Sequence, residues 1–67
     1  MTELILTPNI AGPDDFYAEL LAAHEGLSKD ESDALNARLI LVLANQIGDR
    51  ETLSRAIATA REAVPKR

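Results

Sequence analysis

The sequence contains no cysteine, one histidine and only 3% aromatic residues. Without cysteine, a disulfide framework and thiolate chemistry are excluded, and His24 alone cannot build the usual nitrogen- and sulfur-ligated zinc site. A chain of 67 residues is in the size range where a single core is marginal without further support. Regular helix packing and association with another chain are the supports that remain.

Positive charge and long apolar stretches are also scarce. The net charge is -4, which disfavours nonspecific attraction to nucleic acid or to an anionic membrane. The longest apolar run, residues 39–44, is far below the ~18 residues of a membrane span, and the N-terminus lacks the basic and apolar regions of a signal peptide. We therefore expect a cytoplasmic protein.

The charges that are present are divided unevenly along the chain. Residues 1–33 carry eight acidic residues and one basic residue, a charge of -7, whereas residues 34–67 carry six basic and three acidic residues, a charge of +3. One interpretation is that acids gather at helix starts and bases at helix ends, where the macrodipole favours them by ~0.3–1 kcal/mol each. The other is that the basic half steers a partner.

Residues 1–12 are predicted to form an extended arm. Pro8 and Gly12 are turn-formers, and the apolar stretch 4–6 is too short for a helix. The arm is either laid over the helices of its own chain to cover the core, or donated as a strand to a partner.

Turn and cap residues predict helices in the rest of the chain. A first helix opens at Pro13 and ends at Gly26, because proline suits the first turn and glycine suits a left-handed cap. Ser28 and Glu31 form a capping box for a second helix that continues to Gly48.

Asp49 caps a third helix, which Pro65 stops. The predicted fold is therefore all-α: a small three-helix domain over residues 13–67, with a long apolar central helix and the extended N-terminal arm before it.

The central helix carries more apolar residues than a small bundle needs. At 100° per residue its apolar side chains sweep most of the circumference, and only Arg38 and Asn45 mark a polar edge. A surface helix needs an apolar arc little wider than ~100°. Part of the helix is therefore expected to face another chain, unless the arm covers it. Asn36, Arg38, Asn45 and Gln46 lie within or beside the arc, either to bind a partner or as ordinary helix surface.

No constellation of residues predicts catalysis. His24 lies beside Glu25, but general base chemistry needs a partly dry pocket that three short helices hardly provide. The acids Asp30, Glu31 and Asp33 lack the alternating ligands, the glycine and the terminal glutamate of an EF-hand loop. No catalytic, metal-binding or cofactor-binding residue is predicted, and the protein is not expected to be an enzyme.

Residues 43–56 look like the helix-turn-helix of lac-type repressors. The segment from Gly48 to Thr52 is one residue shorter than in that family, which would turn the second helix by ~100°. Thr52, Ser54 and Arg55 would then miss the major groove. A compact DNA-binding regulator is therefore kept as the alternative function, because the C-terminal half is basic.

Three segments carry a resemblance over nearly the full length: Asp15-Phe-Tyr17, residues 35–45 and Gly48-Asp49. Through them the chain resembles a family of short proteobacterial proteins classed as a domain of unknown function and encoded near flavin-dependent aromatic-ring hydroxylases. The resemblance implies a small cytoplasmic accessory subunit and supplies no catalytic residues.

The function predicted from these features is a non-catalytic helical protein–protein interaction module. It would be an accessory or stabilising subunit of a larger enzyme, such as a flavin-dependent oxygenase, or a self-associating small protein, so an oligomer or a heteromer is expected. The candidate partner-binding residues are Asn36, Arg38, Leu41, Asn45, Tyr17 and Leu39.

Overall fold

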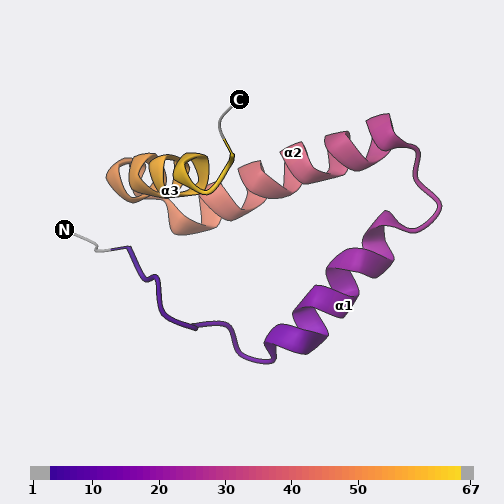
Figure 1. Cartoon of the computed structure of the whole chain (residues 1–67), viewed down its shortest axis with the longest axis horizontal. Helices are drawn as coiled ribbons and strands as arrows, with labels where there is room; N and C mark the ends of the chain where they lie inside the picture. The colour runs from indigo at the N-terminus through magenta and orange to yellow at the C-terminus, as the bar shows by residue number, and fades with distance from the viewer. Residues whose placement is uncertain (1–3, 66–67) are drawn as a thin grey trace.

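Three helices make up most of the chain in the computed structural model, which describes residues 4–65 (Figure 1). They are α1 (Pro13–His24), α2 (Lys29–Ile47) and α3 (Arg50–Glu62). Residues 4–65 contain no β-strand. The predicted all-α fold with three helices is confirmed.

The predicted caps of α2 are both present. The Ser28 hydroxyl accepts a hydrogen bond from the Glu31 backbone N–H at 3.2 Å, and the Glu31 carboxylate accepts one from the Ser28 N–H at 2.9 Å. At the other end, Gly48 has a φ of 76°, a conformation that costs a residue with a Cβ roughly 1–2 kcal/mol. These local signals set where α2 begins and ends.

The start of α1 differs from the other two helix starts. Pro13 is its first residue, as predicted, but the preceding Gly12 is left-handed with a φ of 62° and has no side chain to cap the helix. The helix ends at His24, two residues before the left-handed Gly26. α1 is therefore slightly shorter than the helix predicted from Pro13 to Gly26.

The helices do not close into a bundle. α2 and α3 pack against each other, whereas α1 diverges from α2 beyond the loop that joins them (Figure 1). The radius of gyration is 13.8 Å, compared with about 11 Å for a compact domain of this length. The accessible surface is 6218 Å², compared with about 4,200 Å² for a folded monomer of 7.3 kDa.

The helices also do not enclose a core. Among residues 4–65 no hydrophobic side chain is buried, and the buried residue is a polar one, Thr52, at 7% exposure. The exposed large apolar side chains of the helices are Phe16, Tyr17, Leu21, Ile40, Leu41, Val42, Leu43, Ile47 and Ile57.

The described part of the arm leaves this apolar surface uncovered. Residues 4–12 form no helix or strand and extend away from the start of α1 (Figure 1). The arm's own Ile5 and Leu6 are 61% and 73% exposed, and Ile40 on α2 is 64% exposed. The cover role considered for the arm is therefore not seen in residues 4–12, while residues 1–3 of the predicted arm lie outside the described residues.

The prediction of a long apolar central helix is wrong. α2 is the longest of the three helices, but it begins with the charged segment 29–33, and its apolar run is confined to 39–44. In the part of the chain that the structure describes, no helix is long and apolar enough to cross a membrane.

Candidate functional site

One face of α2 is defined by a regular spacing of residues. Ala34, Arg38, Leu41 and Asn45 alternate between separations of four and three residues, which is the spacing of a helix–helix seam. All four are exposed, and Leu41 reaches 69%. We call these four residues the Leu41 face. It brings together three of the predicted partner-binding residues: Arg38, Leu41 and Asn45.

The predicted residue Leu39 lies on the side of α2 that faces α1. It is half-buried and lines a groove of about 170 Å³ between the two helices. The other residues of the groove are Phe16, Glu19, Leu20, Ala23 and Leu35. Leu39 therefore contributes to packing within the chain. It lies on a different side of α2 from the Leu41 face.

Asn36 also serves a contact within the chain. Its side-chain oxygen lies 2.9 Å from Nε2 of His24, and Nδ1 of His24 donates to the Leu20 carbonyl at 2.9 Å. Both ring nitrogens of His24 thus lie within hydrogen-bond distance of an oxygen atom, and the histidine links the end of α1 to α2. This position gives His24 a structural role.

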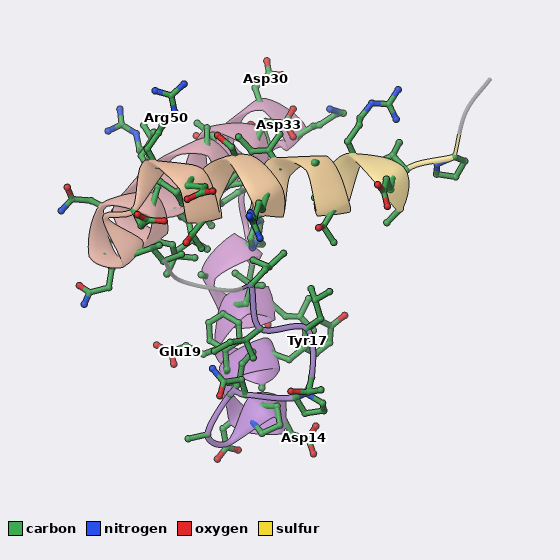
Figure 2. The ribbon with its side chains drawn as sticks, turned by 90° about the vertical axis from the view of Figure 1, so that its left-hand side faces the viewer. Asp14, Tyr17, Glu19, Asp30, Asp33 and Arg50 are labelled. Carbon is green, nitrogen blue, oxygen red and sulfur yellow. The ribbon has the colours of Figure 1, made fainter. Side chains whose placement is uncertain are left out.

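Tyr17, the sixth predicted residue, lies on α1 and is 61% exposed. It projects from the opposite side of α1 to Glu19 (Figure 2). Because Glu19 lines the groove between α1 and α2, Tyr17 faces away from that groove. The six predicted residues therefore belong to separate surfaces and do not form one site.

Charged residues mark the two ends of α2. Asp30 and Asp33 are in its first turns, and Arg50 is the first residue of α3; all three project to the same side of the molecule (Figure 2). Lys29 and Asp33 form an ion pair at 2.9 Å with side chains 87% and 62% exposed. Such an exposed pair contributes little, about 0–1 kcal/mol. Within residues 4–65, neither Asp30 nor Arg50 has an ion-pair partner.

Four exposed residues on or near α2 were not among the predicted partner-binding residues: Asp33, Ala34, Val42 and Arg50. Val42 is 64% exposed, next to the Leu41 face. The alternating separations of the Leu41 face could have identified Ala34 from the sequence, because the pattern continues through it. No sequence signal shows that Asp33 and Arg50 project to the same side.

A side-chain cap at Asp49 fixes the start of α3. Its Oδ2 accepts a hydrogen bond from the Thr52 backbone N–H at 2.8 Å and another from the Thr52 hydroxyl at 2.6 Å. These hydrogen bonds from Thr52 favour the charged carboxylate and hold the pKa of Asp49 below its ordinary value of 3.8. The cap also places Thr52 in a buried, hydrogen-bonded position.

We predict that this cap is lost in acid. Because the pKa of Asp49 is lower in the folded state, its stabilising effect is full above 3.8 and disappears as the pH falls through the folded-state value. The helicity of the chain, followed by circular dichroism, should decrease as the pH falls below 3.8 and through the folded-state pKa of Asp49. Asp49→Asn keeps a good N-cap that does not titrate, so it should remove this part of the pH dependence. An unchanged acid transition in Asp49→Asn would contradict the assignment.

The arm carries a separate apolar hollow. Residues Ile5, Leu6, Thr7, Pro8, Asn9, Ile10 and Pro13 line it, with a volume of about 540 Å³. Ile10 is 58% exposed, like the other large apolar side chains of the arm. Within residues 4–65, no group of three or more His, Cys, Asp or Glu is placed to hold a metal ion.

These features define a small all-α protein in which no hydrophobic side chain of the described residues is buried. The sequence profile of the family described as Protein of unknown function (DUF2783) matches residues 4–62, and the chain belongs to this family. The comparisons with curated proteins and with solved structures gave no match. The predicted membership of a family of unknown function is confirmed.

Proposed function

We propose that this protein is a non-catalytic interaction module that buries its apolar surface against another protein chain and acts as an accessory or stabilising subunit of a larger enzyme. The observation that carries the proposal is the lack of any buried hydrophobic side chain in residues 4–65. A helical fold that leaves most of its large apolar side chains exposed needs a partner surface to bury them.

The size of the exposed surface supports the same proposal. The accessible area of 6218 Å² exceeds that of a folded monomer of this mass by about 2,000 Å². Each partner contributes about 800 Å² to an interface of standard size. Each Leu, Ile or Val removed from water contributes ~1.5–3 kcal/mol, so burying several of them supplies the 5–15 kcal/mol typical of a stable domain.

The cellular setting of the proposal comes from the family resemblance. We place the protein in the cytoplasm of a proteobacterium, with a flavin-dependent aromatic-ring hydroxylase as the first enzyme to test as its partner. Two surfaces are available for contacts: the Leu41 face of α2, and the apolar side chains of the arm, of which Leu6 is the most exposed at 73%.

The proposal predicts that the midpoint of thermal unfolding depends on the concentration of the chain. A chain stabilised by association gains stability as the partner concentration rises, whereas a monomer with its own core has a constant midpoint. Circular dichroism melts over a hundred-fold range of chain concentration, about 3 kcal/mol in binding free energy, should show a rise of several degrees. The purified hydroxylase, added to dilute chain, should raise the midpoint further.

A cooperative transition with a midpoint independent of concentration and of the added enzyme would contradict the proposal. The alternative function, a DNA-binding regulator, predicts instead a salt-dependent affinity for duplex DNA through Arg50, Arg55 and Arg61. The same melts with duplex DNA in place of the enzyme distinguish the two. We expect no stabilisation by DNA, and charge-neutral variants of the three arginines should associate normally with the enzyme.

A further inference from the structure

We draw no further inference here: the strongest candidate, the exposed Leu41 face of α2, is an unpartnered apolar face, and nothing in residues 4–65 shows what covers it.

Discussion

Leu41→Glu is expected to abolish self-association of the chain. Leu41 is 69% exposed on the Leu41 face, and burying a leucine against another copy of the chain contributes ~1.5–3 kcal/mol. A glutamate there removes this contribution and buries a carboxylate in the contact, with a desolvation cost of several kcal/mol. The dissociation constant should rise at least a thousand-fold, measured by analytical ultracentrifugation.

The helix itself should tolerate this change. Leucine and glutamate have nearly equal helix propensities, so α2 should form as readily in the variant wherever it is supported. The matched control is Ile57→Glu on α3, because Ile57 is 70% exposed and Leu41 is 69% exposed. Equal losses in the two variants would show that association depends on apolar surface in general, and the Leu41 face would lose its assigned role.

Leu6→Glu is expected to weaken binding to the larger enzyme while leaving self-association intact. Leu6 is the most exposed large apolar side chain of the described residues, at 73%, and it lines the hollow of the arm. Loss of its burial, at ~1.5–3 kcal/mol, together with the cost of a buried carboxylate should weaken heteromeric binding about a hundred-fold or more. The measurement is titration calorimetry of the chain into the purified flavin-dependent hydroxylase.

The neighbouring substitution Thr7→Glu is the control for Leu6→Glu. It adds the same charge one residue along the arm, at a side chain that is already polar, so the enzyme should bind this variant nearly as well as the original chain. If Leu6→Glu also prevents dimer formation, the arm takes part in the contact between copies. The arm would then be a segment exchanged between the two chains.

Leu41 and Leu6 therefore test two separate surfaces. Loss of only self-association in one variant and only enzyme binding in the other would establish a dimeric accessory subunit with a face for each partner. Loss of both interactions in Leu41→Glu would show that dimer formation precedes enzyme binding.

The sequence was sufficient for the local structure. Ser28 and Glu31 cap α2, Gly48 closes it in a left-handed conformation, and Asp49 caps α3. Each of these features depends on contacts between residues no more than four apart, so residue type and spacing decide them. The long apolar character predicted for the central helix was wrong, because the charged segment 29–33 belongs to α2 and its continuous apolar run is confined to 39–44.

The predicted partner-binding residues were a single group in the sequence and are separate in the structure. Asn36 is hydrogen-bonded to His24, and Leu39 lies in the groove against α1, whereas Leu41 is exposed. All three lie on one helix, and helical periodicity shows only that they point in different directions. Which side of α2 contacts α1 depends on how the loop between the two helices orients them.

The sequence by itself determined that the chain forms three helices and that side chains cap the starts of α2 and α3, because these features follow from local hydrogen bonds. Only the tertiary structure decided that α1 diverges from α2, that α3 packs on the end of α2, and that the Leu41 face stays uncovered (Figure 1). The same arrangement sets Asp30, Asp33 and Arg50 on one side of the molecule. The physical reason is that these features depend on the directions of two interhelix connections, and pairwise contacts between distant residues set those directions.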